Sequence, residues 1–163
     1  MPESAASKQK INSVIEPSPE QQSSTFVCSR DTLDGAYPSL ILAINGRRLG
    51  METTIFYTFM GINVIRRGGA AKCKFVPGGT MGAIPGMSSV ASWMMRKKIN
   101  KAGIPTLDEL MEIAQLEGVK LVACKMTIDM MGLGQEDFIE GVEIQTAEAY
   151  LKHARNCKIN MFT

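Results

Sequence analysis

Short apolar segments that resemble β-strands alternate with longer helix-like segments along this chain of 163 residues. Such alternation predicts an α/β fold, because each helix crosses over between two parallel strands. None of the strand-like segments shows a long alternation of polar and apolar residues. That pattern is typical of strands buried on both faces of a parallel sheet. We therefore expect a mainly parallel sheet of about five strands with helices packed on it.

The segments follow one another in a regular order. The expected strands are Thr25–Ser29, Thr53–Phe59, Lys120–Ala123 with Val119 before it, Val142–Ile144 and Lys158–Phe162. The expected helices are Ala36–Leu49, Ser88–Asn100, Leu107–Leu116, Ile128–Met131 and Ala147 to about Arg155. Local signals support the helix ends, since Gly50 is a natural C-terminal stop and Thr106 with Glu109 forms a capping-box pattern. Thr146 is the expected cap of the last helix.

The N-terminal residues differ in composition from the rest. Residues 1–24 are rich in Ser, Gln, Glu, Pro and Lys and contain no continuous apolar run. This composition predicts a polar, mobile arm without a signal peptide, followed by a single domain over residues 25–163.

A second unusual segment lies in the middle of the chain. The stretch Phe75–Met95 carries no charge and is long enough for a membrane span, but its prolines and glycines would break a helix in lipid. We expect a surface loop and no integral span. The overlapping segment Arg66–Pro85 is expected to be irregular, either as a plain insertion or as a lid or oligomer contact.

Charge and cysteine spacing exclude several functions. Lys and Arg number 18 against 16 Asp and Glu, and a net charge of +2 is too balanced for a dedicated nucleic-acid binder. The four cysteines (Cys28, Cys73, Cys124 and Cys157) contain no CxxC pair, and the chain has one histidine. The sequence therefore predicts no metal site, and four reduced thiols indicate a cytoplasmic protein.

Cys124 is distinguished by its position. It directly follows an expected strand and precedes an expected helix, and functional groups of open α/β sheets collect at the carboxyl edge of the strands. Lys125 and a helix start near Thr127 should favour the thiolate, which makes Cys124 a candidate nucleophile. A small buried apolar residue is the alternative. Met126 is the first of several methionines here, which either fill the core or form a dry wall around the sulfur.

The other thiols have weaker signals. Cys28 ends the first expected strand, so it should lie near the same sheet edge as Cys124, either packed in the core or as a resolving partner. Cys73 lies between two lysines in a loop and is expected to be exposed, while Cys157 is expected to be structural. His153, in the last helix, is expected to be solvated.

Several stretches, in order, resemble one known family. They are TFVCSRDTLDGAYPSLILAINGRRLGMETTIFYTFMGIN, PGMSSVASWMMRKKI and ACKMTIDMMGLGQEDFIEGVE, the last around Cys124. Together they are similar to the DsrE/DsrF-like sulfurtransferase family, in the DsrE-related branch sometimes labelled peroxiredoxin-like. The resemblance implies a three-layer α/β/α sandwich, a homo-oligomer such as a trimer or hexamer, and a persulfide carried on Cys124. It also implies that no cofactor is needed and that TusA-like or rhodanese-like proteins donate and accept the sulfur.

The peroxiredoxin label is not supported by the residues themselves. A peroxidatic cysteine usually lies in Pro-x3-Thr/Ser-x2-Cys, whereas Leu121 and Glu117 lie three and seven residues before Cys124. We therefore expect a sulfurtransferase or sulfur carrier that relays sulfane sulfur. Two alternatives stay open at this point: a non-catalytic binding or scaffold protein, peripheral to a membrane, and a thiol redox protein that uses Cys28 together with Cys124.

Overall fold

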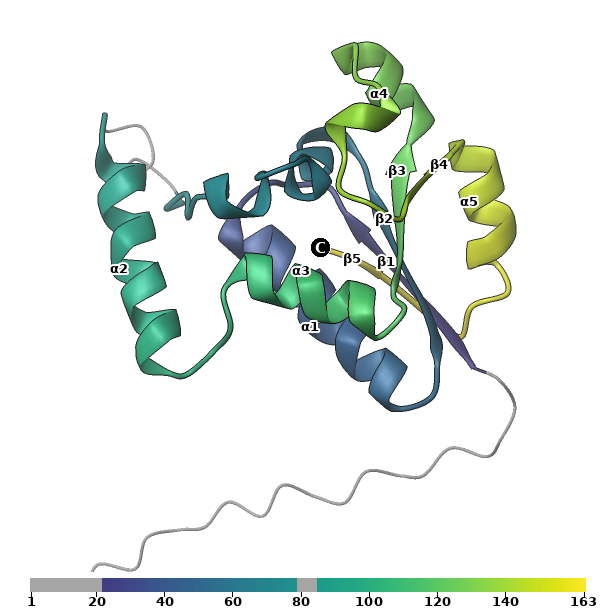
Figure 1. The fold of residues 1–163 in the computed structure, drawn as a ribbon, viewed down its shortest axis with the longest axis horizontal. Coiled ribbons are helices and arrows are strands. Elements are labelled where there is room, and N and C mark those ends of the chain that lie inside the picture. The colour runs from purple at the N-terminus through teal and green to yellow at the C-terminus, as the bar shows by residue number, and fades with distance from the viewer. Residues whose placement is uncertain (1–21, 79–84) are drawn as a thin grey trace, which may run out of the picture.

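The computed structural model describes residues 22–78 and 85–163, which form a five-stranded sheet in the order β4-β3-β2-β1-β5 (Figure 1). All four neighbouring pairs are parallel, as predicted. The strands are β1 (Ser23–Cys28), β2 (Glu52–Tyr57), β3 (Lys120–Cys124), β4 (Val142–Gln145) and β5 (Ile159–Phe162). Because β1 begins at Ser23, the expected end of the arm at residue 24 lies inside this strand. Residues 1–21 of the expected arm lie outside the described residues.

The order in which the strands are added to the sheet determines which face of the sheet each helix covers. The chain adds β2, β3 and β4 in succession on one side of β1 and then crosses back to place β5 on the other side. Parallel crossovers are right-handed, so reversing the direction moves the crossover helix to the opposite face. Helices α1 (Leu33–Arg48) and α3 (Leu107–Leu116) accordingly cover one face, and α5 (Ala147–Ala154) covers the other (Figure 1). The expected three-layer α/β/α sandwich is confirmed.

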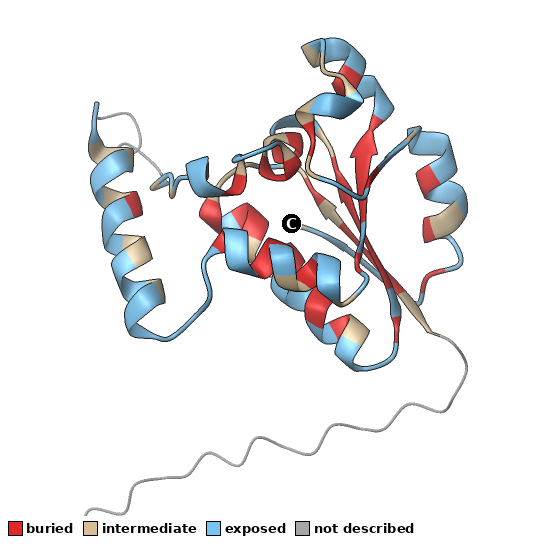
Figure 2. Ribbon diagram, in the orientation of Figure 1, coloured by how far each residue is buried: buried red, intermediate tan, exposed pale blue. Residues whose placement is uncertain are grey.

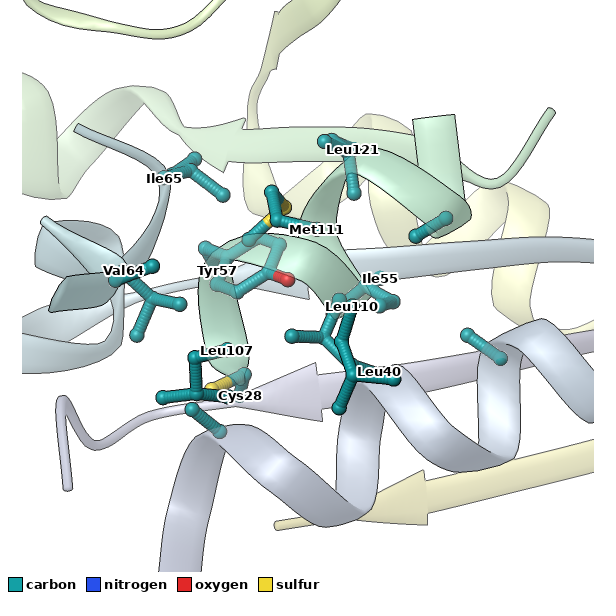
Figure 3. Close-up of a cluster of buried hydrophobic side chains, with 14 of the residues drawn as sticks. Cys28, Leu40, Ile55, Tyr57, Val64, Ile65, Leu107, Leu110, Met111 and Leu121 are labelled. Carbon is teal, nitrogen blue, oxygen red and sulfur yellow. The ribbon is translucent and has the colours of Figure 1, made fainter. Parts of the chain in front are cut away.

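Two clusters of buried side chains fill the spaces between these layers. The three central strands β1, β2 and β3 are buried along most of their length, whereas the edge strands β4 and β5 are largely exposed (Figure 2). The main core lies between the sheet, α1 and α3, and includes Cys28, Leu40, Ile55, Tyr57, Leu110 and Leu121 (Figure 3). The smaller core lies under α5 and consists of Phe56, Val122, Cys124, Tyr150 and Ala154. There the rings of Phe56 and Tyr150 stack with their centroids 4.2 Å apart.

The helix ends follow the local signals. Thr106 and Glu109 form the predicted capping box, and the Thr146 hydroxyl accepts a hydrogen bond from the amide of Ala149. Gly50 follows α1 with a φ of 80°, a conformation that glycine adopts without strain. Helix α1 begins at Leu33 and not at the expected Ala36, because Leu33 is itself buried and extends the apolar face by one turn.

The segment between β2 and α3 is less regular. It contains the 3₁₀ helices η1 (Phe59–Ile65) and η2 (Ala70–Lys72) and the long helix α2 (Met87–Lys101), and residues 79–84 lie outside the described part. Helix α2 stands apart from the sheet in Figure 1. The Arg96 guanidinium connects α2 to the segment around η2, because it donates hydrogen bonds to the carbonyl oxygens of Ala71 and Cys73 at 2.8 and 2.7 Å.

The exposed residues of α2 differ from what an amphipathic pattern suggests. Val90 and Met94 are exposed although both are apolar, and Ser92 is buried against the backbone of Phe75. Among the described residues, no helix is long and apolar enough to cross a membrane. Residues 79–84 of the charge-free stretch Phe75–Met95 lie outside the described residues, so this statement does not cover them.

Candidate functional site around Cys124

Cys124 lies at the carboxyl edge of the sheet, as predicted. It is the last residue of β3 and also the N-cap of α4 (Lys125–Met131). The helix therefore begins immediately after the cysteine, earlier than the expected start near Thr127. The side chain belongs to the smaller core under α5 and is 5% exposed. This burial agrees with the alternative that Cys124 is a small buried apolar residue. A nucleophilic role would therefore depend on hydrogen-bond donors close to the sulfur.

Two threonines meet beside this thiol. Tyr57 of β2 pairs with Ala123 of β3, so Thr58 follows β2 at the level where Cys124 ends β3. The hydroxyl oxygens of Thr58 and Thr127 are 3.3 Å apart. The amide of Phe59 donates to Thr127 Oγ1 at 3.1 Å. Because this oxygen already accepts the amide proton, the Thr127 hydroxyl can direct its own proton to the sulfur.

These donors make Cys124 more acidic than an ordinary thiol. Burial opposes ionisation, but the amide and hydroxyl of Thr127, the hydroxyl of Thr58 and the amide of Met126 together outweigh it and lower the pKa of Cys124. Among the described residues, the Cys124 side chain makes no hydrogen bond that caps α4. A thiolate is a stronger acceptor than a neutral thiol, so donors in this position favour the ionised form.

Two of the expected supporting residues, Lys125 and Met126, have exposed side chains. The ammonium of Lys125 pairs with the carboxylate of Asp129 one turn later, and both side chains are largely exposed. Such a surface pair contributes little to stability. The side chains of Met126 and Met130 are 74% and 60% exposed, so they neither fill the core nor enclose the sulfur in a dry wall. Met126 contributes to the site through its backbone amide.

Phe59 is strained where it adjoins the site. Its φ of 46° places a bulky residue in the left-handed region, and its side chain is 62% exposed. Such conformations cost about 1–3 kcal/mol and persist only when the surroundings impose them. Here the strained residue supplies the amide that holds Thr127. Sequence reasoning missed Thr58 and Phe59 because their closeness to Cys124 depends on β2 and β3 being neighbours.

Cys28 lies at the same edge but on the opposite face. Cys28 belongs to the main core beside α1 (Figure 3). Cys124 belongs to the smaller core under α5. Strand β2 separates them, and two strand spacings amount to about 10 Å, beyond the limit of about 7 Å for a disulfide. Burial also raises the pKa of Cys28. A resolving pair would require movement of the sheet, which counts against the redox alternative.

The remaining thiols and the histidine are buried or partly buried. Cys73 is 2% exposed, so the expectation that it is exposed is wrong. Cys157 is buried, and its sulfur lies 3.5 Å from His153 Nε2. That nitrogen is also 3.2 Å from Thr54 Oγ1, so His153 is partly buried and not simply solvated. Within residues 22–78 and 85–163, no group of three or more His, Cys, Asp or Glu side chains could hold a metal.

The threonine contacts lead to a prediction about reactivity. Replacing Thr127 by Val removes the hydroxyl that donates to the thiolate and should raise the pKa of Cys124. One charge-assisted hydrogen bond corresponds to about one pKa unit, so alkylation at pH 7 should slow by about tenfold. The rate of iodoacetamide modification at Cys124, followed by peptide mass mapping from pH 5 to 10, measures both the rate and the midpoint.

Thr127→Ser is the matched control for that experiment, because it retains the hydroxyl. It should keep the wild-type midpoint. Wild type should titrate at a lower pH than an unperturbed cysteine thiol. A Val variant that reacts with the wild-type rate and midpoint would show that Thr127 has no influence on the thiolate.

The fold and the site define a class of small α/β proteins with a cysteine of lowered pKa at the carboxyl edge of a parallel sheet. The family model described as DsrE/DsrF/DrsH-like matches residues 20–162. This protein belongs to that family, which confirms the resemblance in the sequence.

Two relatives and one solved structure are similar over most of the chain. The "Sulfur carrier protein DsrE2" of Allochromatium vinosum is 30% identical over 159 residues, covering 88% of this chain and 99% of that protein. The "Uncharacterized protein YrkE" of Bacillus subtilis is 32% identical over 151 residues, covering 85% and 94%. The crystal structure of the ychN protein from E. coli matches with a TM-score of 0.59 at 18% identity, covering 87% of this chain and 99% of that one, and supports the fold.

Proposed function

We propose that this protein is a sulfur carrier that holds sulfane sulfur as a persulfide on Cys124. The arrangement that supports this most directly is a cysteine at the carboxyl edge of the sheet beside two threonine hydroxyls and two helix amides, which lower its pKa. The similarity to a relative named as a sulfur carrier supports sulfur as the atom that this thiolate carries. The proposed role is therefore a sulfurtransferase, with Cys124 as the nucleophile and Thr58 and Thr127 as its hydrogen-bond donors.

The proposed reaction consists of two exchanges at sulfur. The Cys124 thiolate attacks the outer sulfur of a donor persulfide, R–S–SH, forming a new S–S bond as the donor's S–S bond breaks. The donor leaves as a thiolate and takes up a proton, and Cys124 becomes Cys–S–SH. An acceptor thiolate then attacks the outer sulfur and releases Cys124. No external oxidant or reductant is consumed. The donors from Thr58 and Thr127 assist the second step too, because a thiol of low pKa leaves faster.

The surface beside Cys124 suits protein partners. Phe59, Met60, Met126 and Met130 are all exposed large apolar residues on the segments that follow β2 and β3. Aromatic and methionine side chains are enriched at protein interfaces, and methionine adapts to more than one partner. We propose that donor and acceptor proteins of the TusA-like or rhodanese-like kind approach here. We also propose that the protein is a cytoplasmic homo-oligomer, as the family resemblance implies.

Sulfur loading tests the proposal. Incubating the protein with glutathione persulfide and measuring its intact mass should show an added mass of about 32 Da, one sulfur atom, on wild type. Peptide mapping should place the label on Cys124, and Cys124→Ser should remain unlabelled. Cys157→Ser serves as the matched control and should load normally. Equal labelling of Cys124→Ser and wild type would refute the assignment.

A further inference from the structure

A second site lies outside the surroundings of Cys124. A cavity of about 370 Å³ opens between the segment after β1, the turns η1 and η2, and η4 (Gln135–Asp137). Most of its lining comes from residues 63–73, which overlap the segment that the sequence predicts to be irregular. Its volume lies within the range of small-molecule sites. The proposed sulfur chemistry at Cys124 uses none of these residues.

The deeper wall of this cavity is held by hydrogen bonds. The Asn63 amide donates to Asp31 Oδ2 at 3.0 Å, and Arg66 Nη1 approaches Asn63 Oδ1 at 3.5 Å. Arg66 also lies 3.9 Å from Asp137. All four side chains are partly buried. Gly69 permits this packing, since a Cβ there would lie 1.8 Å from the Asn63 carbonyl oxygen.

Charges of both signs line the cavity in equal number. Asp31, Glu136 and Asp137 are acidic, and Arg66, Arg67 and Lys72 are basic. Arg67, Lys72 and Glu136 are exposed and form its outer part. A simple anion bound here would be repelled by the carboxylates, and a simple cation would be repelled by the guanidinium groups. A ligand that carries both charges would satisfy the two sets together.

We infer that this cavity binds a small zwitterion of the amino-acid or short-peptide type. Its ammonium would lie against Asp31 and Asp137, and its carboxylate would be held by the guanidinium groups of Arg66 and Arg67. Guanidinium groups suit a carboxylate because they can donate two parallel hydrogen bonds to it. This inference does not rest on the sulfur-carrier proposal, because it requires no reaction at Cys124.

Binding of S-methylglutathione and S-methylcysteine to the full chain tests this inference. Both carry an ammonium group and a carboxylate on one carbon, and neither has a free thiol that could exchange with the protein. Isothermal titration calorimetry should show saturable binding of at least one of them at one site. Acetylating the amine of the bound compound, or esterifying its carboxylates, should weaken binding by about tenfold or more, because each change removes a charge-assisted hydrogen bond.

Matched variants locate the site. Arg66→Gln should weaken binding of the same compound by about tenfold, while its circular dichroism spectrum shows that it is folded. Arg48→Gln is the control, because Arg48 pairs with Glu117 elsewhere on the surface. Cys124→Ser should bind as wild type does, whatever its sulfur loading. The inference is overturned if neither compound binds saturably, if blocking their charges has no effect, or if Arg66→Gln binds normally.

Discussion

Replacing Gly61 by Ala should lower the free energy of unfolding by about 3 kcal/mol, at the upper end of the usual cost of overpacking. A Cβ at this position would lie 2.1 Å from the carbonyl oxygen of Cys28, which is backbone and cannot rotate away. Either η1 or the end of β1 must shift. For a domain of this size the midpoint of thermal unfolding should fall by about 10 °C, which differential scanning calorimetry measures directly.

Gly78→Ala is the matched control for Gly61→Ala. A Cβ at residue 78 would meet nothing within 4 Å, so we expect no loss of stability there beyond about 0.5 kcal/mol. If Gly61→Ala unfolds at the wild-type temperature, η1 does not pack on β1 as described. The same packing places Thr58 and Phe59 beside Cys124, so the variant should also reduce the rate of alkylation at that thiol.

Alkaline pH should destabilise the protein through Cys73. Burial, followed by the nearby carboxylate of Asp31, raises the pKa of Cys73 from 9.0 to about 12 in the folded state. The unfolded thiol ionises near its ordinary pKa, so between about pH 9 and 12 the unfolded state binds fewer protons than the folded state. Stability is then full below this range and falls as pH rises, by up to about 1.4 kcal/mol per pH unit from this thiol. Burial raises the pKa of Cys28 in the same direction.

Urea denaturation at pH 8, 9, 10 and 11 measures this dependence. Cys73→Ala should show a shallower decrease than wild type, because it lacks one buried thiol that stays protonated. The comparison of slopes separates this effect from the titration of lysines and tyrosines, which both proteins share, and from any constant loss caused by the smaller side chain. Parallel pH profiles in the two proteins would show that Cys73 ionises normally in the fold.

Local patterns predicted the elements well because their causes are local. The capping box at Thr106 satisfies the first amides of α3, and Gly50 supplies the backbone conformation that follows the end of α1. A short apolar run predicts the strand β3, and the position of Cys124 at the end of that run predicts its place at the carboxyl edge. These features depend on residues a few positions apart in the chain.

Burial of particular side chains was predicted less well. Cys73 lies between two lysines, which indicated an exposed loop, yet it is buried where the chain folds back onto the main core. The sequence predicts that Met126 lies either in the core or in a wall around the sulfur, yet its side chain is exposed. Neighbours in sequence do not determine which side of a loop or of a short helix faces the protein.

The sequence by itself determined the alternation of strands and helices, the parallel sheet and the place of Cys124 between a strand and a helix. Each of these follows from backbone conformation and from periodicities of a few residues. Only the tertiary structure decided that Thr58 and Thr127 meet beside this thiol and that Cys28 faces the opposite core. The reason is that strand order and face are set by long-range pairing: the neighbour of β3 is β2, which lies more than 60 residues earlier in the chain.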